Sequence, residues 1–421
     1  MSKIQNDGSE PLLSSGVKLN EPIDTLCLCT YDESCKFAVS AFKRRPMGPE
    51  DVVIQMKYCG ICHSDVHSAA SQLMKRATYP ITPGHELAGV AIAVGNNVTR
   101  VKVGDQIGVG CLVDSCLDCE KCAEGNEHKC KKGSTGTYGG LDKHGRAQTY
   151  PKNTPIMGGY TSVHVIHERF AVIIPPSYDL KFAGPVMCAG ITMYDPLKVQ
   201  GVTKGTNVGI VGLGGLGEMG LKLANVMGAN VFAISRSPGK KDYAMRCGAH
   251  EFIVSTNKDD MKKHEGKLDL ILNTVPFYHD YTFYKQLLTR NGKQCILGLH
   301  AGIGAGMFIN KVSCCKSRLM ASGIGGMKNT QEVIDICAKH EIYPDIKVIP
   351  VWEVNRVYEM LDSGNKTGLR YVLDLEGTLN EEAVEKVKNE KAPKMLPART
   401  HLNLMGVIKE LCWVLCCCKH V

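Results

Sequence analysis

Apolar positions recur with two different periods along the chain, which predicts two kinds of structural unit. From about residue 25 to residue 178, short β-like runs such as 52–56 alternate with Gly and Pro turns, so we expect a mostly β unit. From about residue 201 to residue 323, apolar runs are separated by helical stretches, a pattern typical of a parallel sheet with covering helices. The main runs of this second unit are NVGIVGL, NVFAIS, LDLILNTV and KQCILGL, and the helix EMGLKLANVMG follows the first.

The sequence after residue 323 predicts a return to the β-rich unit. Segments 329–339 and 352–362 have helical spacing, and 369–375 has the pattern of a final strand. We therefore expect sequence from both sides of the α/β unit to complete the β unit. The polar start of the chain shows no sustained periodicity and is expected to be flexible. The limits we expect are 1–24 for this extension, 25–180 with 324–378 for the β-rich domain, 181–323 for the α/β domain and 379–421 for a tail.

Length and composition fit two globular domains. The 421 residues are 44% hydrophobic and 22% charged, and such a length is roughly two to three times that of one domain. The net charge is +8, but the basic residues are mixed with 42 acidic ones and form no single basic stripe. Only 6% of residues are aromatic, so no nucleic-acid partner is expected. The chain has no long apolar run that would predict a membrane span. It also has no apolar region near Met1 that would predict a secretory signal, so the expected location is the cytoplasm.

The 20 cysteines are then expected to be metal ligands or free thiols rather than disulfides. Four of them have the spacing C-x2-C-x2-C-x7-C, which places four thiolates around one tetrahedral structural zinc ion: Cys116, Cys119, Cys122 and Cys130. A bacterial iron–sulfur run would have a three-residue last gap followed by proline, whereas Lys131 follows here. The acidic residues between the cysteines also disfavour an independent nucleic-acid-binding zinc ribbon.

A second set of candidate ligands lies in the segments CHSDVH (62–67), PGHE (83–86) and GPVMCAG (184–190). Two thiolates and one imidazole, from Cys62, His85 and Cys188, would form the three-ligand zinc site with an open position that catalysis requires. Spacing alone does not establish this trio, because an isolated cysteine in an apolar run is more often a core residue. His67 taken alone is likewise more often a solvated or structural histidine.

The chemistry explains why such a site would be useful. Zinc lowers the pKa of bound water from about 16 to about 7, which corresponds to roughly 12 kcal/mol, and deprotonating an alcohol demands help of this size. In the reducing direction the same ion polarises an aldehyde oxygen. Ser64, two residues after Cys62, could pass on the hydroxyl proton, and His67 could exchange it with solvent.

The run VGIVGLGGLG at 208–217 predicts a dinucleotide site. An apolar strand, the motif G-x-G-x-x-G, a helix and a second strand at 230–235 follow one another, and the glycines let backbone N–H groups approach a pyrophosphate. Where NAD enzymes usually place a carboxylate, the segment SRSPGKK (235–241) offers hydroxyls and cations. Arg236 and Lys240 can pair with a 2′-phosphate, so we expect NADP, the alternative being a solvated basic turn.

These motifs resemble the zinc-containing medium-chain alcohol dehydrogenases, and within them the cinnamyl alcohol dehydrogenase branch. The resemblance covers about residues 25–376, and its marks are YCGICHSDVH, YPITPGHELAG, VGDQIGVG, the cysteine quartet, GGYTSVHVIHERF, VMCAGITMYDPL, IVGLGGLGEMG, ISRSPGKK and SGIGGMKNTQEV. It implies an α/β chain with a GroES-like β-rich catalytic domain and an inserted Rossmann domain with a doubly wound parallel sheet. It also implies NADP, one catalytic and one structural zinc ion, and a homodimer.

The resemblance assigns a role to individual residues of this sequence. Cys62, His85 and Cys188 match the catalytic zinc ligands, Glu86 matches a residue that can exchange onto the metal, and Ser64 and His67 match the proton relay. The residues that match cofactor contacts are His63, Thr192, Gly212, Leu213, Gly214, Gly215, Leu216, Gly217, Ser235, Arg236, Lys240, Thr274, Gly298 and Gly325.

Three departures concern the substrate. Thr135 stands where cinnamyl-type enzymes often carry Trp, and Gly323 stands where a pocket Phe is expected, so the pocket is predicted to be less aromatic. Segment 138–158 is longer and more polar than the family pattern. The implied function is reduction of an aldehyde, or oxidation of a primary alcohol, with NADP(H). The alternatives are a zinc-independent quinone oxidoreductase of the same fold and a non-catalytic membrane-associated binding protein.

The end of the chain lies outside the family pattern. Its apolar residues recur largely at helical spacings: Leu402, Leu404, Met405, Ile408, Leu411 and Leu415. Four nearby cysteines could accept palmitate: Cys412, Cys416, Cys417 and Cys418. Membrane contact is expected only if these cysteines are acylated.

Overall fold

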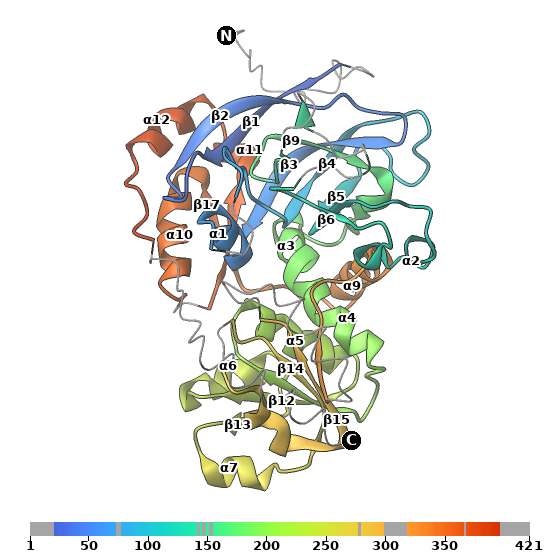
Figure 1. Ribbon diagram of the computed structural model, residues 1–421, viewed down its shortest axis with the longest axis vertical. Coiled ribbons are helices and arrows are strands. Elements are labelled where there is room, and N and C mark those ends of the chain that lie inside the picture. The colour runs from blue at the N-terminus through green and yellow to red at the C-terminus, as the bar shows by residue number, and fades with distance from the viewer. Residues whose placement is uncertain are drawn as a thin grey trace, which may run out of the picture.

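The computed structural model describes residues 21–72, 77–140, 144, 149–150, 155–276, 279–298, 318–365 and 368–395. These residues form a β-rich part and an α/β part, and helices α3 (Leu180–Pro185) and α4 (Ile191–Val199) lie between them (Figure 1). The expected tail helix and the four cysteines considered for acylation lie outside the described residues, as do residues 1–20. Among the described residues, no helix is both long enough and apolar enough to cross a bilayer.

The β-rich part is built around β3 (Asp51–Ile61), a central strand of a seven-stranded sheet. The strands follow the order β10-β5-β4-β3-β18-β17, and β9 also pairs with β3. The other strands are β4 (Leu87–Val94), β5 (Gln106–Val109), β9 (Val163–His167), β10 (Val172–Ile173), β17 (Ile346–Pro350) and β18 (Arg370–Asp374). Because β18 pairs with β3, sequence from both sides of the α/β part shares one sheet. The domain limits themselves stay a prediction.

A hairpin and two helices pack over this sheet. The hairpin strands are β1 (Ile23–Thr30) and β2 (Phe37–Arg44), and the helices are α10 (Val354–Asp362) and α12 (Glu381–Asn389). The ring of Phe37 meets that of Tyr358 edge-on, with 4.7 Å between ring centres. Ala383 and Val387 of α12 are fully buried, so part of the expected tail packs as a helix against β2. Each fully buried large apolar side chain stabilises the fold by roughly 1.5–3 kcal/mol.

The α/β part contains a six-stranded sheet in which every neighbouring pair is parallel. Its order β13-β12-β11-β14-β15-β16 places the first strand of the unit, β11, in the middle. The strands are β11 (Asn207–Val211), β12 (Asn230–Ser235), β13 (Glu251–Val254), β14 (Leu268–Asn273), β15 (Leu288–Ile296) and β16 (Leu319–Ala321). This confirms the predicted parallel sheet, whose order is that of a dinucleotide-binding Rossmann fold.

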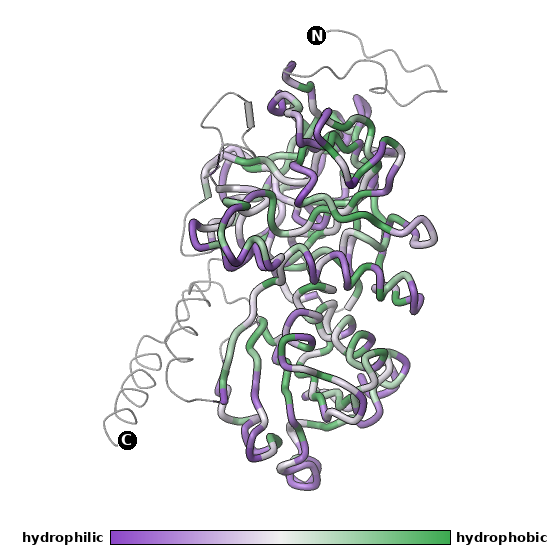
Figure 2. Tube along the Cα trace, turned by 90° about the vertical axis from the view of Figure 1, so that its right-hand side faces the viewer, coloured by the Kyte–Doolittle hydropathy of each residue, from purple (hydrophilic) through white to green (hydrophobic). Residues whose placement is uncertain are grey.

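Helices cover this sheet as the apolar pattern predicts. They include α5 (Gly215–Val226), α6 (Lys241–Arg246) and α7 (Lys258–Lys263), whereas α9 (Met327–Lys339) packs against α4 and the turn before it. Hydrophobic positions line the strands and hydrophilic positions mark the turns between them (Figure 2). Met193, Leu223 and Val333 are fully buried in one cluster, which joins α4, α5 and α9. This cluster holds the junction between the two parts, where the candidate site lies.

Candidate active site

Strand pairing brings the first two candidate ligands together. Cys62 directly follows β3 and His85 lies just before β4, and the two strands run antiparallel with Cys59 opposite Leu87. The Gly60 N–H donates to the carbonyl oxygen of Glu86 at 2.9 Å, so the two strand ends leave the sheet side by side. Residues more than twenty positions apart therefore meet at one edge of the sheet.

The third candidate ligand comes from the turn that joins α3 to α4. Cys188 lies in a π-helical turn, Val186–Gly190, and such local widenings are frequent at functional sites. A Cβ atom on Gly184 would lie 2.3 Å from the Glu86 carbonyl oxygen, so only glycine allows α3 to approach this closely. As a result, Cys188 Sγ lies 3.9 Å from Cys62 Sγ and 3.2 Å from His85 Nε2.

The donor atoms fit a zinc ion. Atoms of Cys62, His85, Glu86 and Cys188 all lie within 4.8 Å of one another. Two Zn–S bonds of about 2.3 Å at a tetrahedral angle place their sulfurs about 3.8 Å apart, close to the separation found here. Glu86 Oε2 is buried and has no hydrogen-bond partner among the described residues. Two thiols, one imidazole and a carboxylate that can approach suit zinc with one open position.

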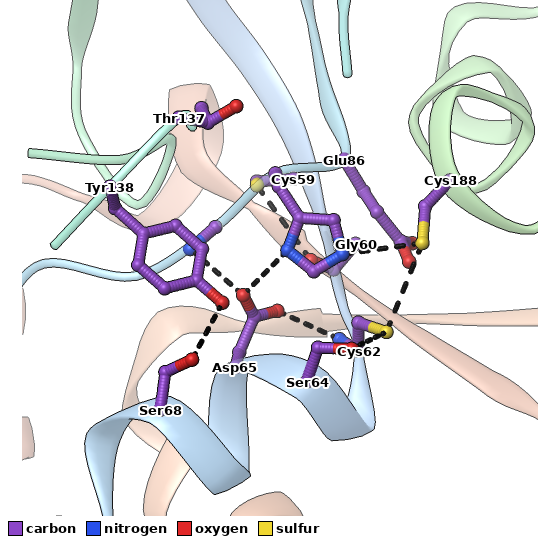
Figure 3. A network of polar contacts seen from close by, with 12 residues as sticks. Cys59, Gly60, Cys62, Ser64, Asp65, Ser68, Glu86, Thr137, Tyr138 and Cys188 are labelled. Atoms are coloured by element: carbon purple, nitrogen blue, oxygen red, sulfur yellow. Dashed lines mark hydrogen bonds and ion pairs between the residues drawn. The ribbon is translucent and has the colours of Figure 1, made fainter. Parts of the chain in front are cut away.

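Asp65 fixes the orientation of these ligands. It is fully buried in α1 (His63–Ala69), and its Oδ1 lies 2.9 Å from His85 Nδ1. Its Oδ2 accepts the Cys62 N–H at 2.9 Å and the Tyr160 hydroxyl at 3.2 Å. Figure 3 shows Asp65 in the middle of this network, with Cys62, Glu86 and Cys188 on one side of it. A carboxylate on Nδ1 leaves the Nε2 lone pair of His85 directed at the metal position.

Arg370 of β18 reaches the site from the far end of the sequence. Its guanidinium is ion-paired with Glu86 Oε1, and its Nη2 lies 3.1 Å from where a Cβ atom of Gly215 would be. Arg370 thus lies between the candidate metal ligands and the glycine loop. Burial raises the pKa of the Glu86 carboxyl to about 8, against the opposing effect of the Arg370 charge.

The two candidate proton-relay residues lie on α1. Ser64 Oγ is 3.5 Å from Cys62 Sγ. The buried His67 places Nδ1 2.6 Å from Gln72 Oε1, and Gln72 Nε2 in turn donates to Asp362 Oδ1 at 3.2 Å. Because an amide oxygen only accepts, Nδ1 of His67 carries a hydrogen, and Nε2 is the ring nitrogen left for proton exchange.

The glycine loop has the geometry expected of a pyrophosphate site. Gly212 follows β11 with a positive φ of 90°, and a Cβ on Gly217 would lie 1.8 Å from the Gly212 carbonyl oxygen, so α5 packs directly on the strand end. Leu213, Gly214, Gly215 and Leu216 complete the turn, and α5 begins at Gly215. The Thr274 hydroxyl donates to the carbonyl of Val211 at 2.8 Å, beside the loop. The first N–H groups of α5 are therefore available to an anion.

The basic turn after β12 lies against this loop. Lys240 Nζ donates to the Leu213 carbonyl oxygen at 3.0 Å, while Arg236 is exposed. Ser235 ends β12 and its hydroxyl accepts the Ser237 N–H at 3.2 Å. No carboxylate occurs between residues 235 and 241.

The remaining candidate cofactor residues lie around the junction of the two parts. Gly298 follows β15, and a Cβ there would be 2.0 Å from the Val275 carbonyl oxygen. Thr192 is buried in α4, one helical turn after Cys188. Burial, together with the neighbouring His67, lowers the pKa of His63 to about 4, so this imidazole is neutral near pH 7.

The cysteine quartet forms a second cluster away from this site. All four sulfurs lie within 4.8 Å of one another, with Cys119 and Cys122 separated by 3.6 Å and Cys116 and Cys122 by 3.9 Å. The loop carries the short helix α2 (Glu120–Ala123) and the turn η1 (Glu127–Lys129), and it reaches back to the cluster at Cys130. Four converging thiols with no further position fit a structural zinc ion.

A small, partly open cavity of about 10 Å³ lies beside Met187, the residue that precedes Cys188. Its walls are mostly apolar and come from the β-rich part, from the π-helical turn with α4, and from the start of α9: Gly110, Cys111, Leu112, Met187, Ile191, Ile324, Gly325, Met327 and Thr330. Among the described residues, neither Thr135 nor Gly323 belongs to this wall, and the polar segment 138–158 is only partly described. The prediction of a less aromatic pocket therefore stays a prediction.

Comparison with known proteins decides the family. Residues 48–176 match the family model of the alcohol dehydrogenase GroES-like domain, and residues 215–339 match that of the zinc-binding dehydrogenases. A probable cinnamyl alcohol dehydrogenase 3 of Oryza sativa subsp. japonica is 41% identical over 360 residues, which are 85% of this chain and 95% of that protein. The chain belongs to the zinc-containing medium-chain alcohol dehydrogenases. The predicted family, branch and fold are thereby confirmed.

Two further proteins are similar to this chain over most of its length. The aldehyde reductase YahK of Escherichia coli strain K12 is 40% identical over 332 residues, covering 79% of this chain and 92% of that protein. The crystal structure of CAD from Helicobacter pylori complexed with NADP(H) has a TM-score of 0.74 and 37% identity, covering 85% of this chain and all of that one.

Several residues of the dehydrogenase site carry no motif of their own. Asp65 could have been suspected from its position three residues after Cys62, at the start of a helix where it completes a capping box. Gln72 lies five residues after His67, yet only the folded chain shows that the two side chains meet. No sequence motif marks Arg370 or Cys111 as a site residue. Arg370 reaches Glu86 from a strand far along the chain, and only the folded chain places Cys111 in the cavity wall.

Proposed function

We propose that this dehydrogenase interconverts aldehydes and primary alcohols with NADP(H), and that it works mainly as an aldehyde reductase. The observation that carries the proposal is the convergence of Cys62, His85 and Cys188 beside a Rossmann glycine loop. This donor set fits zinc with an open position, and Arg370, which is ion-paired with Glu86, lies beside Gly215 of the loop. A small-molecule alcohol or aldehyde is therefore the proposed substrate.

Zinc held by Cys62, His85 and Cys188 would act as a Lewis acid on the substrate oxygen, and NADPH would supply the hydride. Asp65 keeps His85 in the tautomer that presents Nε2. Glu86, held by Arg370, is placed to approach the same position.

The proton steps fall to the two residues on α1. In the reducing direction Ser64 gives its hydroxyl proton to the product oxygen, and His67 returns a proton from solvent through Nε2. Gln72 holds the other ring nitrogen, so the reactive nitrogen of His67 stays directed away from it. In alcohol oxidation the same steps run in reverse.

The preference for NADP rests on the turn after β12. Ser235, Arg236 and Lys240 offer a hydroxyl and two cations beside the glycine loop, and no carboxylate there would repel a 2′-phosphate. His63, Thr192, Thr274, Gly298 and Gly325 are the proposed contacts to the rest of the cofactor.

We further propose that the cysteine quartet holds a structural zinc ion, and that the protein is a cytoplasmic homodimer. Four thiols on one loop with few apolar side chains give that loop its stability through the metal. The homodimer follows from the family resemblance, and light scattering of the purified protein at several concentrations measures it.

Metal analysis combined with cofactor kinetics tests the function. We expect two zinc ions per chain and faster oxidation of NADPH than of NADH across aliphatic and aromatic aldehydes. The matched control is Cys188→Ser, which should keep the quartet zinc and lose aldehyde reduction. Quinone reduction by a protein without zinc would instead favour the zinc-independent oxidoreductase, and the proposal would then be wrong.

A further inference from the structure

A buried carboxylate links the cysteine-quartet loop to the cavity wall. Glu127 lies in η1, three residues before Cys130, and is fully buried. Its Oε2 accepts the backbone N–H of Met327 at 2.8 Å. Met327 begins α9 and also lines the cavity beside Met187. One side chain of the quartet loop thus binds directly to the backbone of the pocket.

The other oxygen of this carboxylate is fastened to the quartet itself. Glu127 Oε1 accepts from Arg169 Nε at 2.7 Å, and Arg169 Nη2 donates to the carbonyl oxygen of Cys122 at 2.8 Å. Cys122 is one of the four candidate ligands of the structural metal. The chain of contacts therefore runs from a ligand residue, through Arg169 and Glu127, to Met327.

Close backbone packing reinforces the same link. A Cβ on Gly326 would lie 1.9 Å from the carbonyl oxygen of Gly125, and that oxygen also accepts the Lys328 N–H at 3.4 Å. The quartet loop and the start of α9 are thus in direct contact, with no side chain between them at Gly326. The neighbouring residues Ile324, Gly325 and Met327 line the cavity, so the loop packs against the segment that forms this wall.

We propose that Glu127 is a positioning residue for the substrate pocket, and that the cysteine-quartet loop sets the place of cavity wall 324–327 through it. This inference rests on the proposed function, because segment 324–327, which meets Met187 at this small cavity, is taken as part of the wall of the aldehyde site. The Met327 N–H lies in the first turn of α9 and has no acceptor within the helix, so Glu127 supplies one. The carboxylate also places a negative charge at the helix N-terminus, where the helix dipole favours it. Without the Glu127 carboxylate, segment 324–327 loses its hydrogen bond to the quartet loop and with it a fixed position relative to that loop.

The test compares Glu127→Ala, Glu127→Gln and the control Glu124→Gln. Glu124 lies on the same loop, but its carboxylate is partly exposed and binds Lys121 and Asn126 at the surface. We expect Glu127→Ala to keep two zinc ions and to raise KM for the aldehyde about tenfold with kcat within about twofold, since the change affects binding geometry rather than the reacting groups. Glu127→Gln keeps one acceptor oxygen and should lie between Ala and the unmodified enzyme, and Glu124→Gln should not change KM.

Hydrogen–deuterium exchange provides a readout independent of activity. The amides at the start of α9 should exchange faster in Glu127→Ala than in Glu124→Gln, while those of α5 should not change. Unchanged KM and unchanged exchange in zinc-loaded Glu127→Gln would overturn the inference. This outcome can be measured even if Glu127→Ala fails to fold. If the unmodified enzyme reduces no aldehyde, the proposed function fails together with the inference, whereas an active enzyme with unaffected variants sinks the inference alone.

Discussion

His85 Nδ1 lies 2.9 Å from Oδ1 of Asp65, a carboxylate with no exposed surface. The same carboxylate accepts the N–H of Cys62, so one buried group orients two of the three proposed metal ligands. A strand end, a helix start and a turn between helices are thereby brought to one point. The metal site is therefore held by the ends of regular elements and by a buried carboxylate.

We expect Asp65→Asn to weaken zinc binding or activity by about 10- to 100-fold, the usual effect of removing a carboxylate that orients a metal-binding histidine. The amide carries no charge and has only one acceptor oxygen, so it cannot accept from both His85 Nδ1 and the Cys62 N–H. Competition with a chromophoric zinc chelator measures the affinity. Asp105→Asn, at an exposed turn where Asp105 accepts the Lys102 N–H, is the control and should bind zinc like the unmodified protein.

Cys188→Ser should remove one zinc ion and leave the other. A serine hydroxyl is a poor replacement for a thiolate at a site of two sulfurs and one imidazole, so metal analysis should fall from two zinc ions to about one per chain. Thermal stability should change little, because the quartet and the buried apolar clusters of the two parts are left intact. Retention of both ions would show that Cys188 is not a ligand.

Cys119→Ser should have the opposite signature. Loss of one of four thiolates from a loop with little core of its own should release the structural zinc and lower Tm by about 10 °C. Differential scanning calorimetry with metal analysis measures both effects, and the Cys188→Ser protein is the matched comparison. Equal Tm in the two variants would contradict a structural role for the quartet.

Local spacing explains what could be predicted from the sequence. The quartet lies on one loop and the glycine motif spans one strand–helix turn, so each pattern contains its own geometry. The strands and helices of the α/β part follow from the apolar runs for the same reason. Predicted segment 369–375 is found as β18, and 329–339 lies within α9.

Contacts across the fold explain what could not be predicted. Arg370 is 284 residues from Glu86, and the two meet only because β18 pairs with β3. The approach of Cys188 depends on the absence of a side chain at Gly184, which no local pattern shows. From the sequence alone, Glu127 is also indistinguishable from the surface acids of this charged loop. Only the folded chain shows its contact with the Met327 N–H.

Gln72→Leu should slow alcohol oxidation about tenfold without loss of zinc. Leucine cannot accept the Nδ1 hydrogen of His67, so the ring loses its fixed tautomer and direction, and part of the benefit of acid–base catalysis is lost. Asp362→Asn keeps an acceptor for the Gln72 amide and should have a smaller effect. Steady-state kcat with a primary alcohol measures both variants, and equal kcat in all three proteins would exclude Gln72 from the relay.

Arg236→Glu should convert the cofactor preference. The exposed Arg236 follows β12 beside Lys240, and a carboxylate there would repel the 2′-phosphate of NADPH while accepting the ribose hydroxyls of NADH. Loss of one charge-assisted hydrogen bond predicts a rise of about 10- to 100-fold in KM for NADPH, with KM for NADH falling. Lys258→Glu, an exposed charge reversal at the start of α7, controls for a general effect of charge. If both variants raise KM for NADPH equally, the basic turn does not read the 2′-phosphate and the basis for preferring NADP is removed.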